Sequence, residues 1–265
     1  MCSERIGDAG AAAPLPERRR VLLGGAAVGL SMMAAGLAGC GGGGLDDDAA
    51  LRAVNATAHL AQVDLLFNDW RFATAVGYGG QASAYARRPV WSVGAAGLFE
   101  AKQTGQTALL ARKILALPEG DSGSVVLTGS QSTGLNMRIL DENTPRPAGA
   151  QLRLRVLHGL PGHGALDVHI TSANQPLAGR RPDLVVLSYQ DLSTHATLSQ
   201  GQRLRVTLAG RPDWVLFDNT ATGFNNGMTG TLVIAPTAGA VAVTVTVLPQ
   251  GEAAYRLTSF APTHS

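Results

Sequence analysis

The sequence predicts an all-β fold, in which an N-terminal signal helix precedes two tandem antiparallel β-sandwich domains of immunoglobulin-like type. The first observation behind this prediction is an apolar alternation with a period of two, clearest in VAVTVTVL at residues 241–248 and in LRLRVLH at 152–158, which is typical of strands. The second is that glycine, proline, asparagine and aspartate separate such segments at short intervals, as they do in sandwiches. The third is an apolar run near the N-terminus that ends in small residues.

Composition supports a packed structure and excludes some classes of protein. The chain has 265 residues, of which 45% are hydrophobic, so it can bury the cores of two ordinary domains. Its formal net charge is +2, and only 15% of its residues are charged. A nearly neutral chain without a stripe of lysine and arginine lacks the electrostatic footprint of a nucleic-acid-binding protein, so no nucleic acid is expected as a partner.

Residues 1–39 are predicted to be an export signal. Three arginines, Arg18 to Arg20, precede an uncharged apolar run from Val21 to Ala38, which is the order of charged and apolar regions in a signal peptide. The run is close to the length of a membrane span, so an uncleaved anchor is the alternative. The run RRRVLL leaves the export route open between general secretion and a twin-arginine pathway.

The end of this signal, Leu37-Ala38-Gly39-Cys40, resembles the lipobox of bacterial lipoproteins. The resemblance implies that the sulfur of Cys40 takes a diacylglycerol, that the signal is cut before Cys40, and that the new N-terminus receives a fatty acid such as palmitate. Several acyl chains make such an anchor effectively permanent, because each buried methylene adds about 0.8 kcal/mol. In that family an aspartate after the cysteine retains the protein at the inner membrane, and Gly41 here implies the outer membrane instead.

The two cysteines, Cys2 and Cys40, leave the mature chain without a disulfide. Cys2 is removed with the signal and Cys40 is consumed by the lipid, so we expect packing alone to stabilise the folded part.

An internal repeat divides the rest of the chain. LRAVNATAHLAQVDLLFND begins at Leu51 and LRVLHGLPGHGALDVHITS at Leu154, and in each copy an aspartate follows the arginine by twelve positions. Tyr78 matches Tyr189, and MRIL at 137–140 matches YRLT at 255–258. The expected organisation is signal peptide 1–39, lipidated cysteine and flexible tether 40–50, first repeat 51–145, linker 146–151, second repeat 152–260 and tail 261–265.

Individual segments of the repeats carry further predictions. In the run 241–248 the valines share one face and Thr244 and Thr246 the other, which predicts a half-buried strand. Segments 183–189 and 213–218 are further candidate strands, and 106–117 is either a short helix or two strands. The recurring Arg52 and Asp64, and Arg155 and Asp167, predict a structural ion pair between facing strands in each repeat.

The opening of the repeats resembles a bacterial envelope family known only as domain-of-unknown-function family 4397. Copies in that family begin with a strand of the form Arg-x-Val-x-His, followed by a proline- and alanine-rich loop and by Val-Asp-Val. The second repeat keeps this order as LRVLHGLPGHGALDV, whereas the first has Asn55 where His158 stands. The resemblance spans residues 51–260 and implies a β-sandwich fold and an envelope location, without an activity.

The stretch GDSGS at 120–124 resembles the nucleophile motif of chymotrypsin-like proteases, which makes a serine hydrolase a remote alternative. A serine nucleophile requires a base and a carboxylate that orients the base. His59 is the only histidine upstream of Ser122 and stands 63 positions away, which is too little chain for a protease of two barrels. We therefore interpret 120–123 as a turn between runs 113–117 and 124–129, equivalent to the turn 236–239, and expect no catalytic residue.

Histidine and carboxylate side chains gather in the second repeat, where His158, His163, Asp167 and His169 offer ligands suited to zinc. The first repeat offers only His59 and Asp64 in the corresponding region. We expect strand-end histidines that bond the backbone, and neither a metal nor a cofactor.

Aromatic residues gather in the first repeat: Phe67, Trp70, Phe72, Tyr78, Tyr85, Trp91 and Phe99. Aromatic side chains on a sheet face can stack on sugar rings, but in sandwiches they more often belong to the core. We expect a non-enzymatic, membrane-anchored envelope lipoprotein that acts as a binding or structural module, with the membrane and an envelope protein or polysaccharide as partners. A carbohydrate-binding lipoprotein that uses these aromatics is the alternative.

Overall fold

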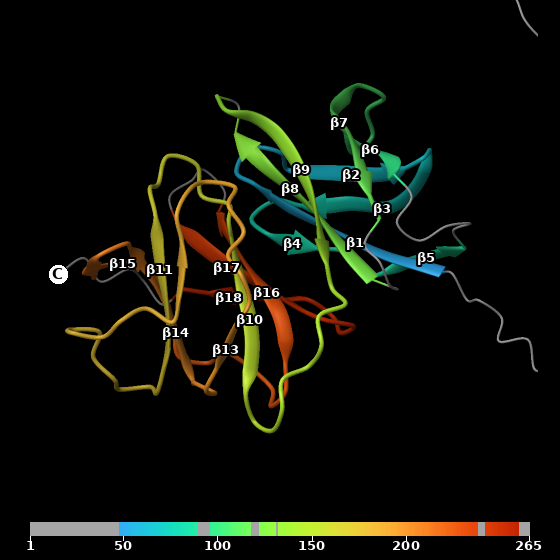
Figure 1. Ribbon diagram of the computed structural model, residues 1–265. Coiled ribbons are helices and arrows are strands. Elements are labelled where there is room, and N and C mark those ends of the chain that lie inside the picture. The colour runs from blue at the N-terminus through green and yellow to red at the C-terminus, as the bar shows by residue number, and fades with distance from the viewer. Residues whose placement is uncertain (1–47, 90–95, 118–121, 131, 238–241, 260–265) are drawn as a thin grey trace, which may run out of the picture. The chain divides into compact units, whose positions relative to one another are not determined.

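The computed structural model describes residues 48–89, 96–117, 122–130, 132–237 and 242–259 (Figure 1). The chain divides into the units 1–44 and 45–265, and all of these residues belong to the second. The predicted signal helix, Cys40, Trp91 and the Gly120-Asp121 pair lie outside the described residues.

The all-β prediction is confirmed, since strands are the only regular elements within the described ranges. The strands are β1 Asp48–Thr57, β2 Gln62–Phe67, β3 Trp70–Gly77, β4 Gln81–Ala82, β5 Ala86–Pro89, β6 Ala96–Gln103, β7 Leu109–Ala116, β8 Ser122–Ser130, β9 Gly134–Asp141, β10 Leu152–His158, β11 Leu166–Thr171, β12 Leu184–Val186, β13 Ala196–Leu198, β14 Arg203–Leu208, β15 Arg211–Asn219, β16 Thr229–Pro236, β17 Val243–Pro249 and β18 Tyr255–Thr258. The ambiguous segment 106–117 therefore contains a strand, β7, and no helix.

Each repeat contributes two sheets. In the first repeat, sheet A has the order β4-β1-β8-β9 with β5 also paired to β1, and sheet B has the order β3-β2-β6-β7. In the second, sheet C has the order β13-β10-β16-β17-β18 and sheet D the order β12-β11-β14-β15. Within the described ranges the ladders are antiparallel except for one in each repeat, where β1 runs parallel to β8 and β10 parallel to β16.

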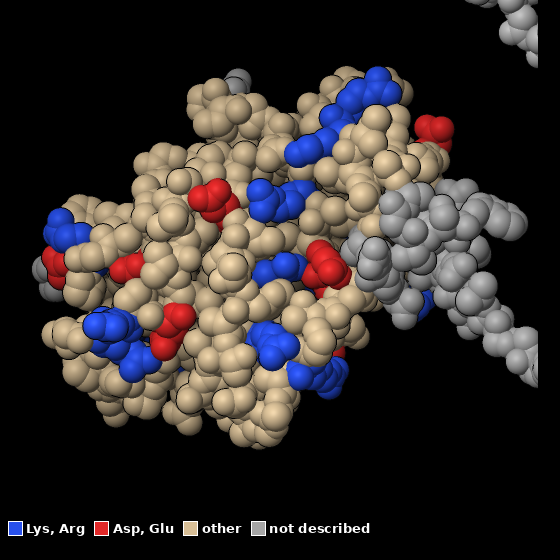
Figure 2. Space-filling model, viewed as in Figure 1, with Lys and Arg blue, Asp and Glu red and all other residues tan. Residues whose placement is uncertain are grey.

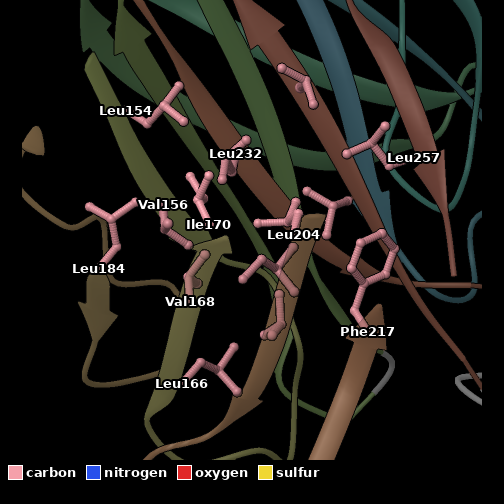
Figure 3. Close-up of a cluster of buried hydrophobic side chains, with 14 of the residues drawn as sticks. Leu154, Val156, Leu166, Val168, Ile170, Leu184, Leu204, Phe217, Leu232 and Leu257 are labelled. Atoms are coloured by element: carbon pink, nitrogen blue, oxygen red, sulfur yellow. The ribbon is translucent and has the colours of Figure 1, made fainter. Parts of the chain in front are cut away.

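A hydrophobic core lies between the two sheets of each repeat. In the first repeat it joins Val125 and Leu127 of sheet A to Leu65 and Phe99 of sheet B. Figure 3 shows the corresponding core of the second repeat, where Leu154, Val156 and Leu232 of sheet C face Val168, Leu204 and Phe217 of sheet D. Both repeats are therefore sandwiches, as predicted.

A third hydrophobic cluster joins the two repeats. It contains Val54, Ala56, Val126 and Leu140 from sheet A and Leu157, Val233, Ala235 and Leu248 from sheet C. Sheets A and C are thus apolar on both faces, and the described unit has four layers in the order B, A, C, D.

This cluster overturns the prediction of a half-buried strand at 241–248. Thr244 and Thr246, the expected solvent face of β17, are only 5% and 0% exposed. The hydroxyl of Thr246 donates to the carbonyl of Gly80 in the first repeat, so the polar face of this strand packs against another layer. Gly80 has a φ of 77°, and a Cβ there would lie 2.4 Å from the Thr246 hydroxyl oxygen, so the contact favours glycine at this position.

Two matches between the repeats need correction. Runs 113–117 and 124–129 do not form a hairpin, because β7 belongs to sheet B while β8 pairs with β1 and β9 in sheet A. The predicted hairpin of the second repeat is present as β16 and β17. MRIL lies in β9, which pairs with β8, whereas YRLT is β18, which pairs with β17. The structural equivalent of β9 is therefore β17, not β18.

Candidate functional site

Cys40, the predicted site of lipid attachment, lies outside the described residues. Among the residues that are described, no helix has the length and apolar character needed to cross a membrane.

Ser122 and His59 are at opposite ends of one ladder. Ser122 begins β8 opposite Ala50, and the parallel β1 continues to Thr57 opposite Gly129 before the exposed His59 follows. At about 3.3 Å per residue, this places Ser122 and His59 about 20 Å or more apart. The two residues that the protease alternative requires are not brought together.

The four candidate metal ligands are divided between two sheets and a loop, because His163 lies between β10 and β11. His158 ends β10 in sheet C, and its ring bonds the backbone, through Nε2 to the carbonyl of Gly164 at 2.8 Å and through Nδ1 to the amide of Leu160 at 3.2 Å. Asp167 and His169 lie on β11 in sheet D, on the face opposite its core residues. Groups of three or more possible metal ligands are absent from the described part of the chain.

A histidine outside that set makes stability depend on pH. Burial and the charges of Arg155 and Arg153 lower the pKa of His195 to about 4, whereas an unfolded histidine titrates at about 6.5. The unfolded chain therefore binds this proton first, and the free energy of unfolding falls as the pH drops from about 6.5 to 4. Burial also lowers the pKa of His158 and of His169, which act in the same direction.

We expect the His195→Asn variant to lose less stability than the natural protein when the pH is lowered from 7 to 4.5. The measurement is the urea midpoint at both values, and His59→Asn is the control because His59 is exposed. A loss in His195→Asn equal to that of the natural protein would contradict the assignment.

The aromatic residues of the first repeat do not gather on one surface within the described residues. Phe67, Phe72 and Phe99 are buried, and the ring of Phe99 contacts the other two. Trp70 is half-buried against Phe72. Tyr78 is 36% exposed and borders a cavity that Arg256 also lines. The clustered aromatic patch that the carbohydrate alternative requires is therefore not formed by these side chains.

The predicted pairs between arginine and aspartate are wrong in both repeats. Asp64 accepts hydrogen bonds from the amide of Ala75 and the hydroxyl of Thr104, and Asp167 accepts one from the amide of Gly210. The arginines lie in sheets A and C while the aspartates lie in sheets B and D. Each aspartate is occupied by groups of its own sheet, so it is not available to the arginine.

Arg52 instead forms the centre of a buried polar network. Its side chain is fully buried and forms an ion pair with Glu142, with 2.8 Å between Nη2 and Oε1. Its Nε donates to the hydroxyl of Ser124 at 2.7 Å, and Ser124 donates to Glu142 in turn. Tyr85 donates its hydroxyl to the same carboxylate and places its ring 4.6 Å from the guanidinium. Burial raises the pKa of Tyr85, which keeps the phenol protonated as a donor.

The same guanidinium bonds the other repeat. Arg52 donates to the carbonyls of Pro249 at 3.0 Å and Glu252 at 2.9 Å. In return, Arg155 of the second repeat donates to the carbonyl of Asp141 at 2.6 Å. Asp141 ends β9 and Pro249 ends its equivalent β17, so each repeated arginine bonds the same position of the opposite repeat. The interface is therefore isologous, like that of a twofold dimer.

The equivalence of the two arginines extends to their strand neighbours. Arg155 donates through Nε to the hydroxyl of Thr231 at 3.0 Å, as Arg52 does to Ser124. Gln250 follows β17 as Glu142 follows β9, and its buried Oε1 has no partner among the described residues. Among the residues that the structure describes, this ion pair is therefore present in the first repeat and not in the second.

A known protein family matches the part of the chain that contains Arg52, Glu142 and Arg155. The model of the family described as "Domain of unknown function (DUF4397)" matches residues 49–169. The family resemblance is confirmed over this range. No curated protein matches the chain.

The DUF4397 match covers the first repeat and only the beginning of the second. It takes in the strands of the first repeat, from residue 49 of β1 onward, together with β10 and residues 166–169 of β11, and it does not continue to residue 260. Arg52, Glu142 and Arg155 lie inside the matched range, whereas Pro249 and Gln250 lie beyond it.

Sequence reasoning found Arg52 but missed Glu142 and Tyr85 as its partners. Glu142 is 90 positions from Arg52 and carries no motif. The sequence nevertheless contained one indication of such a partner, namely that the arginine recurs in both repeats. A buried arginine needs a carboxylate or other acceptor beside it.

Proposed function

We propose that this protein is a lipid-anchored envelope protein whose folded unit acts as a non-enzymatic binding or structural module. The observation that carries the proposal is the run Leu37-Ala38-Gly39-Cys40 directly after an uncharged apolar segment. The proposed anchor is a lipid on Cys40, the proposed membrane is the outer one, and the proposed partners are the membrane and an envelope protein or polysaccharide.

The polar groups of the folded unit support a role without catalysis. The buried serine of the network, Ser124, is hydrogen-bonded to Arg52 and Glu142 and is fully enclosed. The network joins two repeats through backbone carbonyls, which is what a rigid scaffold requires. On the face shown in Figure 2, basic and acidic groups are interspersed rather than separated by sign, which favours partners other than nucleic acid.

The Cys40→Ser variant tests the anchor. We expect the natural protein, grown with labelled palmitate, to carry the label and to sediment with the envelope at its mature size. Cys40→Ser should carry only background label and should not reach that size, because serine offers no thiol for the diacylglycerol. Mass spectrometry of the N-terminal peptide checks the modification directly.

Cys2→Ser is the matched control, since it removes the other cysteine and should leave the label and the mature size unchanged. If Cys40→Ser is still labelled and processed like the natural protein, the proposal is wrong.

A further inference from the structure

The outer face of sheet D is polar and yet buried. Leu166, Val168 and Ile170 of β11 point into the core of the second repeat, so the alternate residues point to the other face. These residues and two neighbours on β14 are no more than 9% exposed. They are Asp167, His169 and Thr171 on β11, and Arg205 and Thr207 on β14. The loop at 172–183 covers this face, because Arg203 donates to the carbonyl of Ala173 and Arg205 to that of Gln175.

Unpartnered polar atoms concentrate under this loop. Several polar atoms here are buried and have no hydrogen-bond partner among the described residues. They are both ring nitrogens of His169, the Nε atoms of Arg180 and Arg205, and the hydroxyl of Thr207. Buried polar groups are normally paired, so such groups are places where a water, an ion or a ligand can bind. Guanidinium nitrogens can only donate, so whatever pairs with them must accept.

Arg205 is the one cation in this cluster without a carboxylate. Arg203 forms an ion pair with Asp218 and Arg180 one with Asp183. Arg205 is 6% exposed, bonds only Thr171 and the carbonyl of Gln175, and has no carboxylate within ion-pair distance in the described part of the chain. Burial lowers the pKa of Arg205 and the charge of Arg203 lowers it further, while Asp218 on the neighbouring strand raises it but is already held by Arg203. A further negative partner would therefore relieve the cost of keeping this charge buried.

A cavity reaches this arginine from the surface. Residues 176–178 of the loop, Arg203 and Arg205 of β14, and residues of β15 that include Asp218 line a volume of about 380 Å³. That volume lies within the usual range for small-ligand sites. Both carboxylates on its wall are already neutralised, Asp218 by Arg203 and Asp213 by Arg211.

We propose that this cavity binds a small oxyanion, a carboxylate or a phosphate, with Arg205 as its charged ligand. A water molecule would satisfy hydrogen bonds but would leave the guanidinium charge uncompensated. An oxyanion provides both the acceptors and the charge, and its bonds to a guanidinium are stronger than neutral ones. The site is independent of the proposed lipid anchor, so either proposal can fail alone.

Titrating the full chain in a nonionic detergent with inorganic phosphate, glucuronate or uncharged glucose tests the site. We expect saturable binding of phosphate or glucuronate, one per chain and with a millimolar or tighter dissociation constant, and at least tenfold weaker binding of glucose. The Nε–H resonance of Arg205 in ¹⁵N-arginine spectra should shift along the same titration. If only phosphate binds, or only glucuronate binds, the result identifies the preferred oxyanion.

Arg205→Gln should weaken the binding at least tenfold. Arg146→Gln is the matched control, because it removes the same charge from an exposed arginine that does not line the cavity. Should Arg205→Gln fail to fold, Ala178→Trp fills the cavity from its exposed loop wall without touching a polar group, and it should abolish binding.

No saturable binding of either oxyanion would overturn the proposal. Equal weakening by Arg205→Gln and Arg146→Gln would also overturn it, because the effect would then come from net charge. Undiminished binding in Ala178→Trp would place the ligand elsewhere.

Discussion

Replacing Glu142 with alanine is expected to lower the free energy of unfolding by roughly 3–5 kcal/mol, because the change leaves Arg52 buried without its carboxylate. The hydroxyls of Ser124 and Tyr85 lose their acceptor at the same time. The loss would be a large part of the stability of an ordinary domain, which is about 5–15 kcal/mol. Urea unfolding followed by intrinsic fluorescence measures it.

Glu252→Ala is the control for this prediction, since Glu252 is half exposed and its side chain, among the residues described, forms an ion pair with the exposed Arg146 alone. We expect a change of about 0.5 kcal/mol or less there. The double change Arg52→Met with Glu142→Leu should cost less than Glu142→Ala, because it removes both charges together. A cost below about 1 kcal/mol for Glu142→Ala would show that the ion pair is not needed for folding.

Truncating the cluster between the repeats is the second large effect. Leu140→Ala and Leu248→Ala, at equivalent positions of β9 and β17, should each lower the free energy of unfolding by about 2–5 kcal/mol. Both side chains are 1% exposed, and each loses its contacts with the opposite repeat. Similar losses are expected because the interface is isologous. Chemical unfolding of the full chain at pH 7 checks both variants.

Leu187→Ala is the matched control, because Leu187 is 70% exposed and its truncation should change stability by about 0.5 kcal/mol or less. If Leu140→Ala and Leu248→Ala had an equally small effect, the two sandwiches would be stable without their shared cluster. The repeats would then behave as separate modules.

The positions of the strands were predictable, because they follow from the local alternation of apolar residues and from the turn residues between them. The segment 152–158 is a strand with the bounds that its alternation predicts, and 213–218 lies within β15. Pairing was less predictable. Ser122 and the residues after it enter a different sheet from β7, since the parallel ladder with β1 connects positions 72 residues apart. Local patterns hold no information about such distant partners.

Of the sites, the lipidation motif at Cys40 is wholly a sequence prediction, and the polar network is wholly a structural finding. The repeated arginine suggested a nearby aspartate, but Asp64 satisfies the backbone of its own sheet. The buried cation Arg205 had no signal in the sequence at all. Its isolation depends on Arg203 already holding Asp218, which becomes visible only when the strands are side by side.

The sequence by itself determined the class of the fold, the presence of two related halves and the candidate anchor, because each follows from periodicity, internal repetition or a short contiguous motif. Only the tertiary structure showed that the two halves share a buried hydrophobic interface between sheets A and C. The threonine face of β17 reads as solvent-exposed from its own residues, and it is buried because another sheet supplies the covering layer. Burial depends on what lies across from a side chain, and that neighbour is set by the whole chain rather than by the strand.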